Sequence, residues 1–305
     1  KLGANSFHQI HERETMKRIY KINYDLIVIG TSNTRLINKV KNQLIRYSLR
    51  TKIASGYVGA LLNNDFESFK KGLLRRSKSD LIWLPGIEAK KRVLKVLSNN
   101  KTKIIDSGLP RFDQLYEIKE DFKQFSQKDI VFFEQPTFPE TKRERIDLVK
   151  KLISLAESNP NTKVIIKPRF SKKVGHAHRP KYLLQDIVSN SKSIPENLLI
   201  SNKDIYSLFN NCKLALTISS TAGLESLLVN IPTYFISDYC SGINKYGSDD
   251  FKSLNATISF EEILNNQFPE IDYKKVPEIL RFDGNNTKRL SDAFKQLIIS
   301  WIINQ

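Results

Sequence analysis

The sequence predicts an α/β protein with two Rossmann-like domains, each built on a mostly parallel sheet. Three observations predict this class. Short apolar segments of strand length alternate with amphipathic segments of helix length, the alternation restarts once after a charged stretch, and 305 residues suit two domains of this kind. In such sheets ligands bind beyond the carboxyl ends of the strands, so the polar loops at those ends are the candidate sites.

The first series of elements begins with Tyr24–Gly30, an apolar segment that ends at a glycine. The segment Arg35–Tyr47 follows it, with Leu36, Val40 and Leu44 at helical spacing. A strand, a polar turn and a helix in this order are typical of the start of a Rossmann unit. The other strands predicted in this half are Thr51–Ser55, Asp80–Trp83 and Lys103–Asp106, and the other helices are Phe66–Arg76 and Ile87–Leu97.

The charged stretch Glu117–Lys128 contains no predicted strand and separates the two series. We therefore predict an N-terminal domain over residues 1–120 and a C-terminal domain over 121–305, which includes a terminal helix at Leu290–Ile302. Residues 1–15 precede Met16, the only methionine, and are interpreted as a tag or a flexible extension. In the second domain we predict strands at Asp129–Phe133, Lys163–Ile166, Asn197–Ile200, Leu214–Ile218 and Thr233–Ile236, and helices at Lys142–Ser158, Tyr182–Val188, Ile205–Asn210 and Ala222–Leu228.

Two consecutive doubly wound domains with a terminal helix are the outline of the GT-B fold, which has a cleft between its domains. No apolar run approaches the roughly 20 residues that span a bilayer. Cys212 and Cys240 lack the spacing of a metal site. These features indicate a cytoplasmic location.

The net charge of +17 fits nucleic acid, an anionic membrane surface or phosphorylated small molecules as partners. Nucleic acid is disfavoured because the sequence shows neither a helix-turn-helix nor an RNP-like strand pair. The basic clusters Lys70–Lys78 and Lys90–Arg92 predict peripheral contact with the anionic inner face of the cytoplasmic membrane. The alternative is that these clusters are solvated helix faces.

A run of hydroxyl residues, Ser219, Ser220 and Thr221, lies between a predicted strand and a predicted helix. A helix N-terminus favours negative charge, and hydroxyl and backbone N–H groups there can bind a phosphate. The alternative interpretation is an ordinary N-cap. Three hydroxyl residues in a row exceed what a cap requires, so the segment predicts an anion site.

A second candidate segment follows the predicted strand Lys163–Ile166, where Lys167 and Arg169 place two cations at the carboxyl end. His176 and His178 come shortly after them. Arginine can bind a phosphate in bidentate fashion, and histidine can protonate a departing phosphate. The His-x-His pair also fits a metal, but no neighbouring Cys or Asp completes a site, and a solvated loop is the other alternative.

These motifs resemble a bacterial family of predicted GT-B glycosyltransferases over about residues 24–255. The resemblance rests on the Lys-Pro-Arg strand end, the histidine loop and the segment Ser219–Tyr239, together with three shorter motifs. The pair of loops is also similar to the CMP-binding motifs of bacterial sialyl-, polysialyl- and Kdo-transferases, although Lys167-Pro168-Arg169 stands where those families have His-Pro. Teichoic-acid polymerases, which use CDP-glycerol, have a similar arrangement. The three shorter motifs in the resemblance to the bacterial family of predicted GT-B glycosyltransferases are Ser55-Gly56-Tyr57, Gly108-Leu109-Pro110-Arg111 and Glu134-Gln135-Pro136.

The resemblance implies a glycosyltransferase that moves a sugar, such as a sialic- or Kdo-type 2-keto acid sugar, from a nucleotide donor to a surface glycan or glycolipid. Alternatives on the same fold are a sugar-nucleotide epimerase and a CDP-polyol phosphotransferase. The resemblance further implies that Glu225 contacts the donor ribose, and the alternative for Glu225 is a capping role. It also favours His178 over His176 as the catalytic histidine, which would bind the leaving phosphate or protonate it. The position of Gln135 at the start of the second domain's first loop predicts a donor contact.

The N-terminal half is expected to hold the acceptor and the general base. The acceptor-side candidates Thr31, Ser32, Asn33, Gly56 and Tyr57 follow predicted strands, and by position alone Asp65 and Glu67 are the candidate bases. The sequence contains no Asp-x-Asp motif, so we predict metal-independent chemistry and no cofactor.

Overall fold

The computed structural model describes residues 24–30, 33–57, 59, 66–97, 101–124, 128–136, 138–169, 180–239 and 248–303. The chain forms two compact units. Unit 1 comprises Lys1–Tyr116 and Pro277–Gln305, and unit 2 comprises Glu117–Val276. Each unit contains one parallel sheet with helices packed against it, which confirms the predicted α/β class.

The sheet of unit 1 has four parallel strands in the order β1-β2-β3-β4, so each strand pairs with the next one along the chain. Consecutive right-handed crossovers of this kind place the connecting helices on one face. The strands are β1 (Leu26–Ile29), β2 (Lys52–Gly56), β3 (Leu81–Trp83) and β4 (Lys103–Ile105), and the helices of this part of the chain are α2 (Arg35–Arg46), α3 (Phe66–Arg76), α4 (Ile87–Val96), α5 (Arg111–Ile118), α11 (Val276–Ile279) and α12 (Asn286–Ile303).

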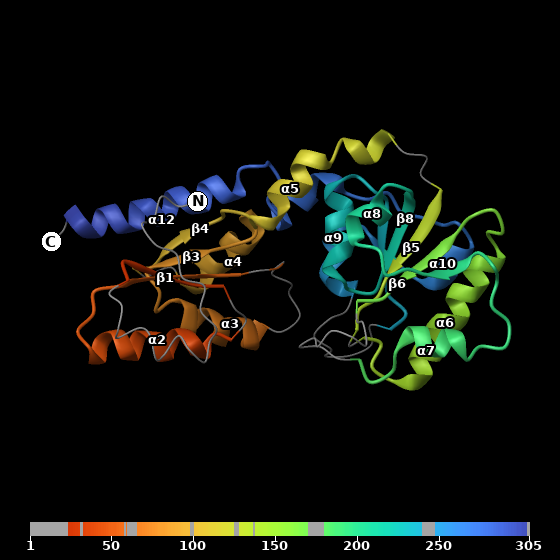
Figure 1. Cartoon of the computed structure of the whole chain (residues 1–305), viewed down its shortest axis with the longest axis horizontal. Helices are drawn as coiled ribbons and strands as arrows, with labels where there is room; N and C mark the ends of the chain where they lie inside the picture. Colours follow the sequence, from red (N-terminus) through yellow and green to blue (C-terminus); the bar gives the residue numbers. More distant parts are fainter. Residues whose placement is uncertain are drawn as a thin grey trace. The chain divides into compact units, whose positions relative to one another are not determined.

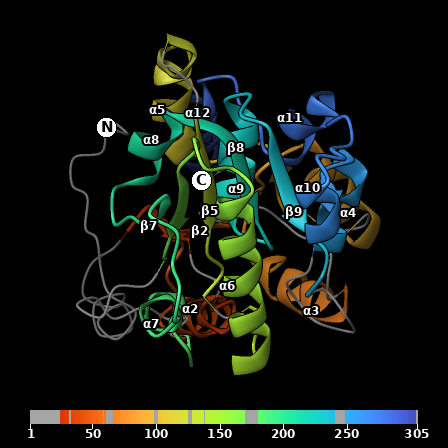
Figure 2. The ribbon, with the colours of Figure 1, turned by 90° about the vertical axis from the view of Figure 1, so that its right-hand side faces the viewer.

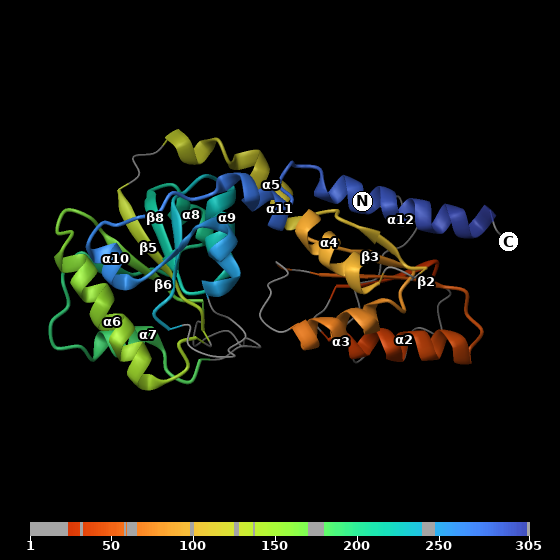
Figure 3. The same ribbon diagram turned by 180° about the vertical axis from the view of Figure 1, so that it is seen from behind.

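The terminal helix α12 covers the other face of this sheet, opposite α2 and α3 (Figures 1 and 3). Alternate residues of β2 and β3, among them Ala54 and Trp83, form an apolar surface on that face, and Phe294 of α12 packs on it edge to face with Trp83. The sequence predicts that residues 121–305 form the second domain, whereas in the structure residues 277–305 belong to unit 1. The helix belongs to unit 1 because its apolar side chains pack against the apolar surface formed by β2 and β3.

The start of α12 is held by α5. The carboxylate of Asp113 accepts hydrogen bonds from the backbone N–H groups of Asn286, at 3.0 Å, and Thr287, at 2.7 Å. The buried side chain of Asn286 lies against Gly108, whose positive φ of 76° suits a glycine and whose lack of a side chain makes room for it. The motif Gly108–Arg111 therefore has a structural role in joining α5 to α12.

The sheet of unit 2 has six parallel strands in the order β10-β9-β8-β5-β6-β7. From β5 the chain adds β6 and β7 on one side, and it then returns to add β8, β9 and β10 on the other side. The strands are β5 (Asp129–Phe133), β6 (Val164–Lys167), β7 (Leu198–Ile200), β8 (Cys212–Thr217), β9 (Thr233–Ile236) and β10 (Thr257–Ile258), and the helices are α6 (Lys142–Glu157), α7 (Leu184–Ser189), α8 (Ile205–Phe209), α9 (Thr221–Leu228) and α10 (Phe260–Leu264).

The reversal of strand order places helices on both faces of this sheet. Figure 2 looks onto α6, which lies in front of the strands, and Figures 1 and 3 show α8 and α9 on the opposite face. The central strand β5 is buried along most of its length, from Ile130 to Phe133. The point at which the order reverses lies between β5 and β8, and ligands of open α/β sheets bind at such points.

The two basic clusters are exposed only in part. Lys70, Lys71 and Lys78 are exposed, but Arg76 is buried over the ring of Tyr57, and Lys90 forms a 2.8 Å ion pair with Asp106. Membrane contact stays a prediction that rests on the exposed lysines. Among the described residues, no helix combines the length and the apolar character needed to cross a bilayer.

Replacing Asp113 by Ala should lower the free energy of unfolding of the chain by about 1–2 kcal/mol, because two N–H groups at the start of α12 lose their acceptor. Urea unfolding measures the loss. Gln114→Ala, at an exposed position of the same helix, is the control and should leave the unfolding midpoint unchanged. Equal midpoints for the two variants would contradict this role of Asp113.

Candidate functional site

The candidate site lies at the carboxyl ends of β5, β6 and β8 in unit 2. Phe133, the last residue of β5, pairs with Lys167 of β6 on one side and with Thr217 of β8 on the other. Neighbouring strands are about 4.8 Å apart, so the backbones of Lys167 and Thr217 are roughly 10 Å apart. The loops after these three strands therefore start side by side at the point where the strand order reverses.

Two hydrogen bonds join the turn between β8 and α9 to the end of β5. The Thr217 hydroxyl donates to the carbonyl oxygen of Phe133 at 2.7 Å and accepts from the N–H of Ser220 at 3.1 Å. Ser220 is the N-cap of α9, and its hydroxyl accepts from the N–H of Ala222 at 3.3 Å. For Ser220 the structure thus shows the cap that we considered as the alternative to an anion ligand.

Ser219 differs from its neighbour. Its hydroxyl is buried, with 4% of the residue exposed, and it has no hydrogen-bond partner among the described residues. A buried hydroxyl without a partner costs about 1–3 kcal/mol, and folded proteins rarely retain one without a reason. This hydroxyl precedes the N-terminus of α9 by two residues, and Thr221, the first residue of the helix, is half-buried. The turn therefore combines the positive end of a helix dipole with an unused donor.

Gly223 of α9 serves packing. A Cβ at this position would lie 2.8 Å from Cγ2 of Thr217 and 3.0 Å from the ring of Phe235, so only glycine lets α9 approach the sheet this closely. Glu225, about one turn after Thr221 on the same helix, is buried. Its contact with a ribose stays a prediction.

The loop after β5 is held by Arg145 of α6. The guanidinium is 2.8 Å from the carboxylate of Glu134 and 2.8 Å from the carbonyl oxygen of Pro139, and it also donates to the carbonyls of Gln135 and Pro136. Arg145 and Glu134 are both buried. Gln135, a predicted donor contact, is buried in the same loop.

Our reading of the sequence did not identify Arg145, although a signal for it is present. It occupies a position on the apolar face of α6, one turn before the buried residues Leu148 and Val149 and two turns before the buried Leu152. Arginine is almost never fully buried without a partner, so a single arginine on such a face predicts a buried acidic or carbonyl partner.

The end of β6 brings a partly buried cation beside this loop. Lys167 is half-buried, and this desolvation lowers the pKa of its ammonium group, while the charges of Asp204 and Glu134 oppose the shift. Burial also disfavours the charged form of Glu134, which raises the pKa of this carboxyl, and the hydrogen bond from Arg145 limits that rise. The backbone N–H of Arg169 also donates to Glu134, whereas the Arg169 residue is exposed. Lys167, Glu134 and Thr217 therefore lie in a row across three adjacent strands.

Several predicted residues lie outside the described part of the chain. These are His176, His178, Thr31, Ser32 and Asp65, and the side chain of Glu67 in α3 is not described either. The catalytic roles of Asp65, Glu67 and His178 stay predictions. Within the described residues, no three His, Cys, Asp or Glu side chains are grouped in a way that could hold a metal ion.

Three predicted acceptor-side residues lie in the described part of unit 1. Asn33 is exposed just before α2. Gly56 ends β2 under the ring of Trp83, where a Cβ would overlap the ring at 2.0 Å, so the glycine is required by packing. Burial raises the pKa of Tyr57, and the guanidinium of Arg76 lies 4.4 Å from the centre of its ring.

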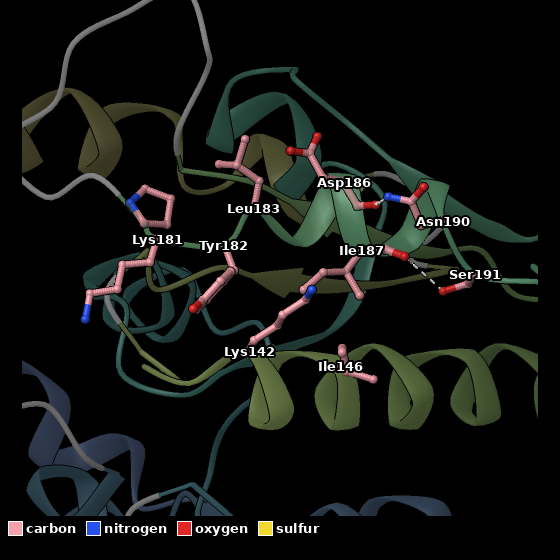
Figure 4. A pocket seen from close by; sticks show the side chains of 10 residues that line it. Lys142, Ile146, Lys181, Tyr182, Leu183, Asp186, Ile187, Asn190 and Ser191 are labelled. Atoms are coloured by element: carbon pink, nitrogen blue, oxygen red, sulfur yellow. Dashed lines mark hydrogen bonds between the residues drawn. The ribbon is translucent and has the colours of Figure 1, made fainter.

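A groove with a volume of 1010 Å³ lies between the start of α6 and the segment that contains α7 (Figure 4). Its walls combine cationic, aromatic and aliphatic side chains, and none of the described residues in the loops at the ends of β5 and β8 lines it. The lining residues are Lys142, Ile146, Pro180, Lys181, Tyr182, Leu183, Asp186, Ile187, Asn190 and Ser191.

Residues 1–274 match the model of a protein family described as "Putative glycosyltransferase (DUF6716)". The chain belongs to this family. A sequence search of curated proteins found no match. The family description agrees with the predicted glycosyltransferase resemblance, while the likeness to sialyl-, polysialyl- and Kdo-transferases stays a prediction.

Solved structures with the same fold include sugar-nucleotide enzymes. The UDP-GlcNAc 2-epimerase of Methanocaldococcus jannaschii, in complex with UDP-GlcNAc and UDP, is 17% identical with a TM-score of 0.61, and the match covers 93% of this chain and 79% of that one. The Neisseria meningitidis enzyme bound to UDP-GlcNAc is 13% identical with a TM-score of 0.61, covering 93% and 80%.

The wall teichoic acid polymerase TagF has the same fold as well. One of its structures is 13% identical to this chain with a TM-score of 0.56, and the match covers 91% of this chain and 74% of that one. At these identities the similarity shows the fold. The two parallel sheets, of four and six strands, match the GT-B fold of the epimerases and TagF.

The two serines of the β8–α9 turn should respond differently to replacement by alanine. Ser219→Ala should leave the free energy of unfolding unchanged or raise it slightly, because no hydrogen bond to a described residue is lost and a buried polar group is removed. Ser220→Ala should lower it by about 1 kcal/mol through loss of the cap. Urea unfolding of both variants checks this. If Ser219→Ala destabilised the protein as much as Ser220→Ala, the Ser219 hydroxyl would have a structural partner.

Proposed function

We propose that the protein is a glycosyltransferase that uses a nucleotide sugar as donor and binds the donor phosphate at the turn between β8 and α9. The family description supports the reaction class and favours transfer over the epimerase and CDP-polyol phosphotransferase alternatives. The single observation that carries the site is the buried Ser219 hydroxyl, which has no hydrogen-bond partner among the described residues and lies beside a helix N-terminus.

The surrounding charges suit a phosphate at this position. The dipole of α9 favours an anion at its first turn. Lys167 adds a partly buried positive charge two strands away, and the negative charge of Glu134 between them is paired with Arg145. A phosphate group bound between Ser219 and Lys167 would therefore meet donors and positive charge on both sides.

The nucleotide of the donor is proposed to be a pyrimidine nucleotide. The motif resemblance suggests CMP, whereas proteins with the same fold bind UDP-GlcNAc and UDP in the epimerases and CDPG in TagF. The acceptor is proposed to be a surface glycan or glycolipid, with the protein at the inner face of the cytoplasmic membrane.

In the proposed reaction the bond between the sugar and the donor phosphate breaks while the acceptor oxygen bonds to the sugar. The acceptor hydroxyl passes its proton to a carboxylate, for which Asp65 and Glu67 are the candidates. His178 binds the leaving phosphate as a cation or protonates it. Lys167, Arg169 and the α9 N-terminus offset the charge of that phosphate, so this scheme needs no metal ion.

A thermal-shift panel of CMP, CDP, UDP, GDP and dTDP followed by calorimetric titration tests the proposal. At least one pyrimidine nucleotide should raise the melting temperature, and Ser219→Ala should weaken its binding about tenfold through the loss of one hydrogen bond to a charged group. Ser226→Ala is the control, because this buried serine of α9 bonds within the protein, to Gly223 and Thr233. It should lower stability without changing the dissociation constant.

Two results would contradict the proposal in different ways. If none of the five nucleotides shifts the melting temperature, nucleotide-sugar transfer is wrong. If a nucleotide binds the wild type and Ser219→Ala equally well, the phosphate site is elsewhere.

A further inference from the structure

We propose that Arg145 is a positioning residue that fixes the loop after β5 in the shape needed for donor binding, although it does not touch the donor itself. The inference rests on the proposed function, since it assigns a role to a residue behind the proposed donor site. Only 1% of Arg145 is exposed, so its effect on a ligand must pass through the groups that it holds.

The guanidinium binds the loop at four places. One nitrogen, Nη1, donates to the carboxylate of Glu134, and the other nitrogens donate to the main-chain carbonyls of Gln135, Pro136 and Pro139. The planar fork of an arginine can meet several acceptors at once, whereas the ammonium group of a lysine is a compact point charge. A guanidinium can therefore reach the carboxylate and the three carbonyl oxygens at once, which a lysine ammonium group cannot do.

The helix that carries Arg145 is itself fixed beside the loop. Thr141 is the N-cap of α6 and forms a capping box with Glu144, in which the N–H of Glu144 donates to the Thr141 hydroxyl at 3.2 Å and the N–H of Thr141 donates to the Glu144 carboxylate at 3.1 Å. The loop thus runs from the end of β5 to the capped start of α6, and Arg145 binds Glu134, Gln135 and Pro136 near its start and Pro139 near its end.

Glu134 extends this control to a second loop. Its carboxylate accepts from Arg145 and from the backbone N–H of Arg169, which follows β6. Arg145 also neutralises Glu134, which would otherwise place an unpaired negative charge between Lys167 and the β8–α9 turn. Arg145 therefore sets both the shape and the charge of the central loop of the proposed site.

Stability alone does not account for an ion pair of this kind. Replacing a buried ion pair by well-packed apolar residues is often neutral or stabilising, because the charges lose their hydration when they are buried. The pair at Arg145 is instead suited to hold three carbonyl groups and one carboxylate in a single arrangement at the end of the central strand. This use of the guanidinium supports a positioning role.

The test compares Arg145→Lys with a matched control, Asn197→Ala. The side-chain amide of Asn197 also donates to three main-chain carbonyls, those of Ala156, Asn159 and Thr162, but it does so at the amino edge of the same sheet. Dissociation constants for CMP, CDP and UDP are measured by calorimetry at a temperature where both variants are folded, and urea unfolding gives their stabilities.

Arg145→Lys should raise the dissociation constant of the nucleotide that the wild type binds by about tenfold, because the loop shifts while the charge beside Glu134 is retained. Asn197→Ala should lower stability and leave the dissociation constant unchanged. Wild-type affinity in Arg145→Lys, or an equal rise in both variants, would overturn the inference.

If Arg145→Lys does not fold, the double variant Glu134→Gln with Arg145→Met replaces it, since it removes both buried charges. It should fold and bind about tenfold more weakly, because the carbonyls have lost their anchor, and wild-type affinity in this variant would overturn the inference. Absence of nucleotide binding by the wild-type protein would instead refute the proposed function.

Discussion

The hydrogen bond from the Thr217 hydroxyl to the carbonyl oxygen of Phe133 joins the two strands between which the sheet of unit 2 reverses its order. Because β5 and β8 are neighbours, the loops that follow them start side by side. The same hydroxyl accepts from the N–H of Ser220 and so fixes the position of the turn that begins α9. The proposed donor site depends on this junction, since it places the Ser219 hydroxyl and the start of the helix at the end of the central strand.

The charge around this junction depends on the buried ion pair between Glu134 and Arg145. Glu134 is a carboxylate at the point where a phosphate is proposed to bind, and on its own it would repel that phosphate. Arg145 pairs with Glu134 from behind, so the positive charge of Lys167 and the dipole of α9 are left to act on the ligand. The site therefore pairs the charge of Glu134 within the protein and places Lys167 and the start of α9 on either side of it, which suits the binding of a phosphorylated donor.

Much of the fold could be predicted because strand and helix periodicities are local properties. The bounds of β5 and β9 agree with those predicted from the sequence, as do those of α3. The short elements β10 and α10 were not predicted, because two apolar residues or one helical turn do not produce a measurable period. The terminal helix was recognised, but its packing on unit 1 depends on the β2–β3 surface, which is a tertiary property.

The candidate site was predicted less completely. The strand–hydroxyl–helix pattern identified Ser219 and Ser220, but it could not tell a cap from a hydroxyl without a partner, because that difference depends on neighbouring loops. Gly56 is a motif residue whose packing role follows from contact with Trp83 on the next strand. Arg145 was missed although it lies on the apolar face of α6, because the sequence does not show which groups of the loop after β5 it binds, the carboxylate of Glu134 and three main-chain carbonyls.

The most direct test of the central claim is a crystal structure of the protein with the nucleotide that binds most tightly. The account predicts a phosphate oxygen within hydrogen-bonding distance of the Ser219 hydroxyl at the start of α9, about 2.5–3.0 Å away. A nucleotide whose phosphate lies away from this turn, with none of its atoms within hydrogen-bonding distance of the Ser219 hydroxyl, would contradict the account.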